Sequence, residues 1–354
     1  MENVAQNTPV LAHVEGSAGI LELNRTRQLN AISGEMVDII SEALHQWADD
    51  DAITHVVLFT KGMKVFCAGG DIRAVRDDAA EGKHERGDHY LTREYRLNLQ
   101  IADFPKPYVS FIDGSVLGGG IGLAMLGSHR VVTENSLAAM PEMAIGWVPD
   151  VGTTYFMAHM VGELGRPIPA LASFVGLTSY PMSPADMLFT GLATHFVPSI
   201  ALDKAIDAVI QEGPVALERF ATDFAQESHV RKYLPLIEDI FGRETWPEID
   251  AAIGGAPDAA FRESIRDLMH AASPTAIVAA TETYAANRKA QSLQEGINNE
   301  YLIGELLRRD PNFHEGVRAV LIDKDAKPAF TPANALEVDP EPYRAAIANA
   351  RQIV

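Results

Sequence analysis

The chain has 354 residues, of which 47% are hydrophobic, so it can bury a large core in one to three domains. Its formal net charge of −19 argues against a nucleic-acid or anionic-membrane surface, because phosphate binding requires a basic face. Cys67 is the single cysteine, which excludes a disulfide framework and favours a reducing compartment. Residues 1–9 lack a signal-peptide pattern and no apolar run approaches membrane-spanning length, so we expect a cytoplasmic protein without membrane partners.

The chain begins with two short predicted strands, residues 10–14 and 20–23, which are joined by a hairpin-like turn. The polar loop 24–31 follows and contains Arg25 and Arg27. These two arginines could meet a phosphate group, or the loop could be a solvated connector, and the residues alone leave both interpretations open.

Helical spacing of apolar residues predicts a helix over 36–47, and the β-branched run 55–60 predicts a buried strand. The charged, glycine-containing stretch 77–88 is expected to be a mobile loop. Residues 91–102 are predicted to form a helix that carries Glu94. This glutamate could equally be a surface partner of its helical neighbours.

Two glycine-rich turns follow predicted strands about fifty residues apart: 61–72, which includes Gly70, and 115–126, which includes Gly118 and Gly119. Glycine permits a sharp turn and a close backbone approach to a ligand. Two backbone N–H groups that converge on one oxygen would form an oxyanion hole. The alternative is that each is only a tight packing turn between a strand and a helix.

Glu142 and Asp150 each follow a proline in a segment rich in glycine, proline and apolar residues. An unpaired acid is costly in such surroundings, and buried acids of this kind often belong to functional sites. Alternatively, each carboxylate caps a helix or pairs with an arginine such as Arg130.

The second half of the chain is predicted to be mainly helical. The whole pattern predicts an α/β fold, divided into a core of residues 1–200, a helical C-terminal region of residues 201–330 and a proline- and alanine-rich, loosely held tail of residues 331–354. Predicted helices cover 171–177, 185–192, 202–211, 261–270, 274–288 and 293–308.

The motifs 67–72 (CAGGDI) and 118–123 (GGGIGL) together resemble the crotonase (enoyl-CoA hydratase/isomerase) superfamily. This resemblance implies the crotonase fold of stacked ββα units with a helical C-terminal region. It also implies an acyl-CoA thioester substrate, whose oxygen would accept hydrogen bonds from the amides of Gly70 and Gly119, with Gly118 in the substrate site.

Within this superfamily the chain looks most like the 3-hydroxyisobutyryl-CoA hydrolase branch. The resemblance extends over nearly the whole chain and is weakest over 212–272. Three stretches carry it: 140–152 (MPEMAIGWVPDVG), 191–197 (GLATHFV) and 314–325 (HEGVRAVLIDKD).

One substitution pattern separates hydrolases from hydratases. Hydratases of the superfamily add water with two glutamates, and the first lies two residues after the glycine triplet, where this chain has Gly122. Glu142 matches the second glutamate, and Asp150 stands where hydratases typically have glycine. Relative to hydratases, one carboxylate is lost at position 122 and another is gained at position 150, so we expect a different reaction.

The resemblance to the hydrolases implies three roles. Glu142 would be the catalytic carboxylate, either as a nucleophile that forms an acyl-enzyme anhydride or as a general base. Asp150 would orient the substrate hydroxyl or the hydrolytic water, and Glu94 would contact the substrate.

The expected function is hydrolysis of an acyl-CoA thioester, 3-hydroxyisobutyryl-CoA, to 3-hydroxyisobutyrate and CoA, a step of valine catabolism. A hydratase or isomerase of the same fold and a non-catalytic acyl-CoA-binding protein are the alternatives. No metal or redox cofactor is implied, because CoA is part of the substrate, and Arg25 and Arg27 are the candidates for its phosphates. The resemblance is compatible with a homo-oligomer. Trp147 and the pair Thr153-Thr154 depart from the residues common in the family at the acyl pocket, so the preferred acyl group stays open.

Overall fold

The computed structural model describes residues 8–350, which form two compact units. The first unit contains residues 8–70, 96–138 and 182–228, and the second contains 71–95, 139–181 and 229–350. The chain therefore passes between the units several times. One passage lies within a single helix, α4 (His84–Ala102).

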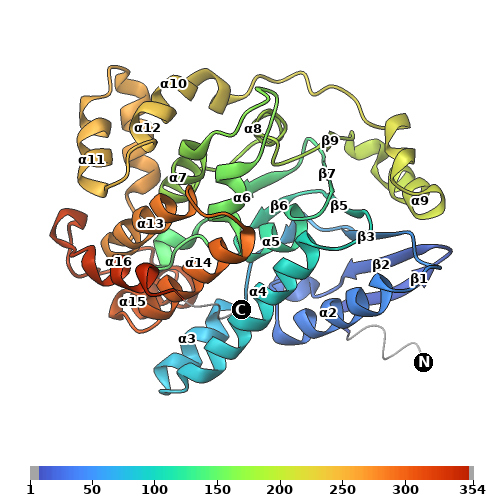
Figure 1. The fold of residues 1–354 in the computed structure, drawn as a ribbon, viewed down its shortest axis with the longest axis horizontal. Helices are drawn as coiled ribbons and strands as arrows, with labels where there is room; N and C mark the ends of the chain where they lie inside the picture. Colours follow the sequence, from blue (N-terminus) through green and yellow to red (C-terminus); the bar gives the residue numbers. More distant parts are fainter. Residues whose placement is uncertain (1–7, 351–354) are drawn as a thin grey trace. The chain divides into compact units, whose positions relative to one another are not determined.

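The first unit is built on a six-stranded sheet with the order β1-β2-β3-β5-β7-β9 (Figure 1). β1 pairs antiparallel with β2, as expected for a hairpin, and every later neighbour pairs in parallel. Parallel pairing of strands separated by helices confirms the predicted α/β class. The strands are β1 (Val10–Glu15), β2 (Ala18–Leu23), β3 (His55–Thr60), β5 (Tyr108–Ile112), β7 (His129–Val132) and β9 (His195–Phe196).

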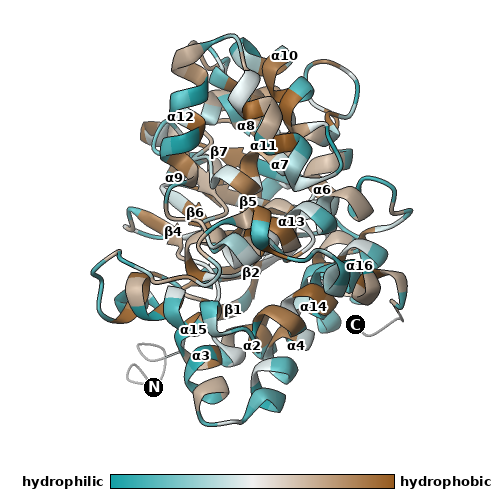
Figure 2. Cartoon of the chain, turned by 90° about the vertical axis from the view of Figure 1, so that its left-hand side faces the viewer, coloured by the Kyte–Doolittle hydropathy of each residue, from teal (hydrophilic) through white to brown (hydrophobic). Residues whose placement is uncertain are grey.

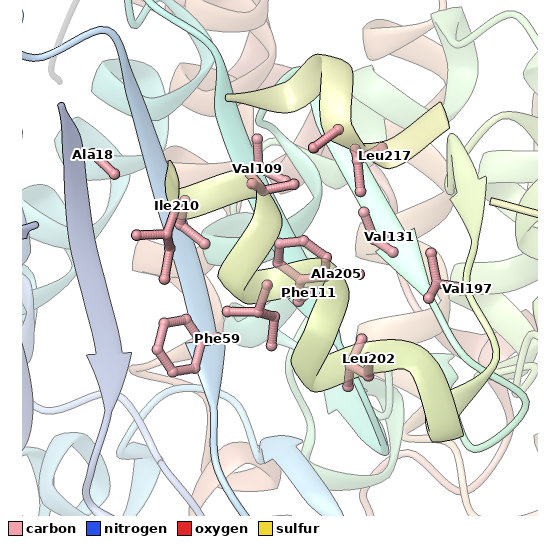
Figure 3. Close-up of a cluster of buried hydrophobic side chains, with 14 of the residues drawn as sticks. Ala18, Phe59, Val109, Phe111, Val131, Val197, Leu202, Ala205, Ile210 and Leu217 are labelled. Carbon is pink, nitrogen blue, oxygen red and sulfur yellow. The ribbon is translucent and has the colours of Figure 1, made fainter. Parts of the chain in front are cut away.

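Helix α9 (Leu202–Glu212) packs its apolar side on this sheet. Figure 3 shows Ala205 and Ile210 of this helix beside Val109 and Phe111 of β5. The five-residue strand β5 is buried throughout, as is typical of a central parallel strand. This cluster forms the main apolar core of the sheet.

A second, three-stranded sheet has the order β4-β6-β8, and each of its strands contains three residues. These strands are β4 (Val65–Cys67), β6 (Ser115–Leu117) and β8 (Leu137–Ala139). The short helix α5 (Gly119–Met125) directly follows β6, as the sequence predicts. The remaining elements of the first unit are η1 (Thr26–Gln28), α2 (Gly34–Ala48), α8 (Pro184–Thr190), η3 (Ser199–Ala201) and η4 (Pro214–Arg219).

The second unit is helical, and its helices carry both hydrophobic and hydrophilic stretches (Figure 2). Helices α7 and α13 are buried over most of their length, and α6, α7, α13 and α14 pack against one another. The elements are α3 (Ile72–Ala80), η2 (Glu142–Ile145), α6 (Thr153–His159), α7 (Pro169–Thr178), α10 (His229–Phe241), α11 (Trp246–Gly255), α12 (Ala259–Met269), α13 (Pro274–Asn287), α14 (Leu293–Leu307), α15 (Pro311–Val317), η5 (Arg318–Ile322), η6 (Ala335–Glu337) and α16 (Glu341–Ala348).

The loop expected over 77–88 is wrong for most of its length. α3 continues to Ala80 and α4 begins at His84, so only a short turn separates the two helices. The charged composition suggested a mobile loop, but Asp88 forms an ion pair with Arg308, more than two hundred residues away. Local sequence carries no sign of such a partner, and tertiary contacts here override the local pattern.

Part of the predicted tail is a helix. α16 packs against α13 and α14, and its Arg344 donates hydrogen bonds of 2.9 and 2.8 Å to both carboxylate oxygens of Glu282. Within residues 8–350, no helix is both long enough and apolar enough to cross a membrane.

Candidate functional site

The two glycine-rich turns of the first unit lie against each other. β4 and β6 pair in parallel, with Cys67 opposite Val116, so the turns leave the same end of the small sheet. Gly69 has a φ of +99°, and a Cβ there would lie 3.1 Å from the carbonyl oxygen of Leu117 and 3.5 Å from the amide nitrogen of Gly119. The residue before Gly70 therefore contacts the turn that contains Gly119.

The glycines after β6 meet two different steric demands. Gly118 directly precedes helix α5 as its N-cap residue and has a φ of +48°, which strains any other residue. A Cβ on Gly120 would lie 2.8 Å from the Cβ of Cys67, so this glycine lets α5 approach β4. Gly119 is the first residue of α5, where the helix offers the amide no internal acceptor.

Cys67 is fully buried, and its thiol donates to the carbonyl oxygen of Asn30 at 3.1 Å. Burial and this backbone partner are typical of a small structural side chain.

The two arginines proposed to hold CoA phosphates lie at the short helix η1. Arg25 Nη1 donates to the carbonyl oxygen of Ala31 at 2.8 Å, so part of its donor capacity stabilises its own loop. Arg27 is exposed and lies at the C-terminal end of η1. Their proposed role in phosphate binding stays a prediction.

The second unit brings together the three carboxyl groups that the sequence singled out. Glu94 lies on α4, Glu142 begins η2, and Asp150 lies in the turn before α6. Their exposed fractions are 3%, 7% and 6%. Three carboxyl groups this deeply buried can be charged together only at high cost, so the protein must keep some of them protonated.

Burial raises the pKa of Glu142 well above its usual range, and the charge of Asp150 raises it further. Burial and Asp150 also raise the pKa of Glu94 to about 8. Among the described residues, Glu142 Oε2 and Glu94 Oε1 have no hydrogen-bond partner. Carboxyl groups with raised pKa values and open oxygens are typical of acid–base sites.

Among the three carboxyl groups singled out by the sequence, Asp150 accepts two side-chain hydrogen bonds. Its Oδ2 accepts hydrogen bonds from Tyr95 Oη at 2.6 Å and from Trp147 Nε1 at 3.0 Å. Burial raises the pKa of Asp150, while these two donors and the positive charge of Arg308 lower it. The pKa of Asp150 is raised overall, but its two donors and Arg308 oppose the rise, whereas burial and the charge of Asp150 act together on Glu142. Such different surroundings can assign different roles to two acids.

Sequence reasoning missed Glu300, a fully buried glutamate on α14. Its carboxyl group accepts hydrogen bonds from the amide of Gly152 at 2.7 Å and from the amide of Thr154 at 3.1 Å. These amides begin helix α6, so Glu300 holds the end of the turn that presents Asp150. Helical periodicity predicted α14 but could not indicate a buried acid on it.

The C-terminal motif 314–325 has a visible role: it supports the segment that carries Glu142. Helix α15 packs against η2. A Cβ on Gly316 would lie 2.4 Å from the carbonyl carbon of Ile145, and one on Gly146 would lie 2.7 Å from the carbonyl oxygen of Asn312. Two glycines therefore allow the close backbone contact that fixes Glu142.

We expect Gly316→Ala to displace η2 and to lower kcat more than substrate affinity. The added methyl group overpacks the contact with Ile145, a change that costs about 1–3 kcal/mol of stability. The matched control is Gly254→Ala on α11, where a Cβ meets nothing within 4 Å. Thermal melting and steady-state kinetics of both variants test this prediction, and equal kinetics in the two would contradict it.

The enoyl-CoA hydratase/isomerase family model matches residues 18–347. The chain belongs to this family. The family match covers both units and includes the segment 212–272, where the resemblance to the superfamily is weakest.

Curated relatives of this family member are named 3-hydroxyisobutyryl-CoA hydrolases. The mitochondrial enzyme of Gallus gallus is 35% identical over 345 residues, covering 94% of this chain and 86% of that protein. The probable 3-hydroxyisobutyryl-CoA hydrolase 2 of Arabidopsis thaliana is 35% identical, covering 93% of this chain and 88% of that protein.

Solved structures confirm the crotonase-type fold predicted from the sequence. A carnitinyl-CoA dehydratase from Mycobacterium thermoresistibile is 34% identical with a TM-score of 0.87, covering 96% of both chains. An enoyl-CoA hydratase from Rhodobacter sphaeroides is 33% identical, also with a TM-score of 0.87, covering 96% of this chain and 97% of that chain. The names of these structures denote water addition or removal, whereas the curated relatives are named hydrolases.

Proposed function

We propose that this family member hydrolyses the thioester of 3-hydroxyisobutyryl-CoA, releasing 3-hydroxyisobutyrate and CoA. The observation that supports this most strongly is the pairing of Glu142 with Asp150 in one buried carboxyl cluster, combined with Gly122 in α5. The names of the curated relatives support the same reaction and substrate.

The chemistry requires attack on the thioester carbonyl carbon and cleavage of the C–S bond. Glu142 either attacks this carbon, giving an anhydride that water then hydrolyses, or removes a proton from the attacking water. In both routes the net reaction consumes one water, and CoA leaves as a thiolate that takes up a proton. A thiolate is a good leaving group, so the reaction needs little acid assistance.

The negative charge that develops on the carbonyl oxygen needs hydrogen-bond donors. We assign this role to the amides of Gly70 and Gly119, with Gly118 shaping the turn. Loss of one such donor costs on the order of 3 kcal/mol in transition-state stabilisation. Asp150 would orient the substrate hydroxyl or the hydrolytic water, and Glu94 would contact the substrate.

Water addition to an enoyl-CoA is the second candidate, favoured by the names of the two solved structures. Gly122 argues against it, because the position of the first hydratase glutamate has no side chain to transfer a proton. A non-catalytic acyl-CoA-binding protein is the third candidate. Three buried carboxyl groups with raised pKa values argue against it, because burying ionisable groups destabilises the fold and binding alone would not require them.

Purified protein should release free thiol from 3-hydroxyisobutyryl-CoA and leave the absorbance of crotonyl-CoA unchanged. A thiol reagent follows the first reaction and the ultraviolet absorbance of the conjugated enoyl thioester follows the second. A panel of short hydroxyacyl-CoA esters then ranks acyl groups. Loss of crotonyl-CoA absorbance, with no thiol released from 3-hydroxyisobutyryl-CoA, would contradict the proposal and indicate a hydratase.

The proposed reaction needs no metal or redox cofactor, because CoA enters with the substrate. Arg25 and Arg27 remain our candidates for its phosphates. Cytoplasmic location also remains a proposal drawn from the sequence, and several relatives at 34–35% identity are named as mitochondrial. Cell fractionation tests the location, and light scattering tests for a homo-oligomer.

A further inference from the structure

Arg308 is an unusual residue for the interior of a protein. It directly follows α14 and is 2% exposed, and it is the one fully buried Lys or Arg among residues 8–350. It forms an ion pair with Asp88, yet its Nε and Nη1 have no hydrogen-bond partner in the described part of the chain. Burying a cation with unsatisfied donors is costly, so its retention calls for a compensating role.

The surroundings of Arg308 connect it to the carboxyl cluster. Its guanidinium lies over two aromatic rings, 5.7 Å from the centroid of Trp147 and 5.5 Å from that of Tyr301. The indole of Trp147 donates to Asp150, and Tyr301 packs edge-on against Tyr95, at 6.3 Å between centroids. Tyr95 is the other donor to Asp150. Both side chains that hold Asp150 thus lie in a layer of aromatic rings built around one cation.

A cation on an aromatic face is attracted by the ring and fixes its orientation, by about 2 kcal/mol when the pair is desolvated. It also draws electron density from the indole, which strengthens the N–H as a donor. Its full charge acts on Asp150 through a poorly polarisable interior, where Coulomb interactions are strong.

We propose that Arg308 is a positioning residue that selects Asp150 as the charged member of the buried carboxyl cluster. It holds the indole of Trp147 in hydrogen-bonding orientation and supplies a positive charge that favours the carboxylate form of Asp150. The negative charge of Asp150 in turn raises the pKa of Glu142 and of Glu94. Arg308 itself touches no reacting atom in this assignment.

Within residues 8–350, the other titratable groups that interact electrostatically with Asp150 are carboxyl groups and tyrosines. They come from α4, η2, α13 and α14, and they are Glu94, Tyr95, Glu142, Tyr284 and Glu300. Every one of these groups is neutral or negative, so none can replace the charge of Arg308.

The ionisation of Asp150 can be followed without turnover through the indole of Trp147. The chain has three tryptophans, so ¹⁵N-tryptophan labelling gives three indole signals, and Trp147→Phe identifies the signal of Trp147. This N–H donates to Asp150, so its chemical shift titrates with that carboxyl group. Asp150→Asn should abolish the titration and thereby assign it.

Arg308→Met should move the titration midpoint of the Trp147 signal to higher pH, because the variant removes the positive charge that lowers the pKa of Asp150. Arg308→Lys, which keeps the charge, should retain most of the wild-type midpoint. The matched control is Arg309→Met, since Arg309 also pairs with Asp88, at 3.2 Å, but its side chain is 39% exposed. Its midpoint should equal that of the wild type.

An unchanged midpoint in folded Arg308→Met, or an equal shift in Arg309→Met, would overturn the inference. If Arg308→Met does not fold, Asp88→Asn decides the question. Removing the counter-ion of Arg308 leaves its positive charge less compensated, so the midpoint should move downward, and an unchanged or raised midpoint would overturn the inference. The kinetic consequence, a lower kcat at neutral pH in Arg308→Met with little change in KM, rests on the proposed function, whereas the titration does not.

Discussion

Replacing Glu142 by glutamine is expected to lower kcat by about 10²–10⁴-fold while leaving acyl-CoA binding nearly unchanged. Glutamine has the same shape and fits the same buried position, but it can neither attack the thioester carbon nor take a proton from water. Thiol release from 3-hydroxyisobutyryl-CoA measures kcat, and calorimetry with the same ester measures binding. Near-normal turnover would remove Glu142 from the mechanism.

The stability of this variant is the control for its folding. Because the folded protein raises the pKa of Glu142, the wild type loses stability as pH rises from the ordinary carboxyl range through the raised value. Glutamine does not ionise and escapes this loss. Glu142→Gln should therefore melt no lower than the wild type at neutral or mildly alkaline pH. A clear drop in melting temperature would mean that lost activity reflects misfolding.

Asp150→Asn has the second largest expected effect, a fall in kcat of about tenfold to hundredfold, since a hydrogen bond to a charged group contributes about 1.5–3 kcal/mol. The variant also removes the negative charge that raises the pKa of Glu142. Glu142 then ionises at lower pH. The acid limb of the kcat/KM profile should therefore move to lower pH even though the maximum rate falls.

The direction of this shift separates two accounts of Asp150. If its charge acts on Glu142, the limb moves down. If Asp150 acted only through contact with substrate, the rate would fall and the limb would stay in place. Rates of thiol release measured at intervals of half a pH unit resolve the two outcomes, and Tyr95→Phe, which removes one donor to Asp150 but no charge, is the companion variant.

Much of the fold was predictable because its signals are local. The β-branched run of β3 and the glycines after β4 and β6 identified buried strands and sharp turns, and the structure confirms both. Gly118 has a positive φ, and Gly120 leaves room for the side chain of Cys67. Steric requirements of this kind are met by glycine, so they are visible in the sequence. The carboxyl pair stood out for a similar reason, since acids in an apolar segment require an explanation.

The features that could not be predicted from the sequence depend on contacts between residues far apart along the chain. The stretch 77–88 resembled a charged loop in sequence, because the residue that pairs with Asp88 is Arg308, far along the chain. Glu300 resembled any polar residue of an amphipathic helix, although it caps α6 from the interior. Gly316 gave no sign that it makes room for the backbone of Ile145. Periodicity reports which face of a helix is apolar, but not which buried polar group lies on it.

The proposed hydrolysis differs from hydration or dehydration in the bond of the substrate that breaks. Mass analysis of the products formed from 3-hydroxyisobutyryl-CoA in ¹⁸O-labelled water tests this directly under multiple turnovers. We predict free CoA and 3-hydroxyisobutyrate in equal amounts, with one ¹⁸O in the carboxylate of the acid, as cleavage of the C–S bond requires. Consumption of the ester without free CoA, with formation of the unsaturated acyl-CoA by loss of water, would contradict the account.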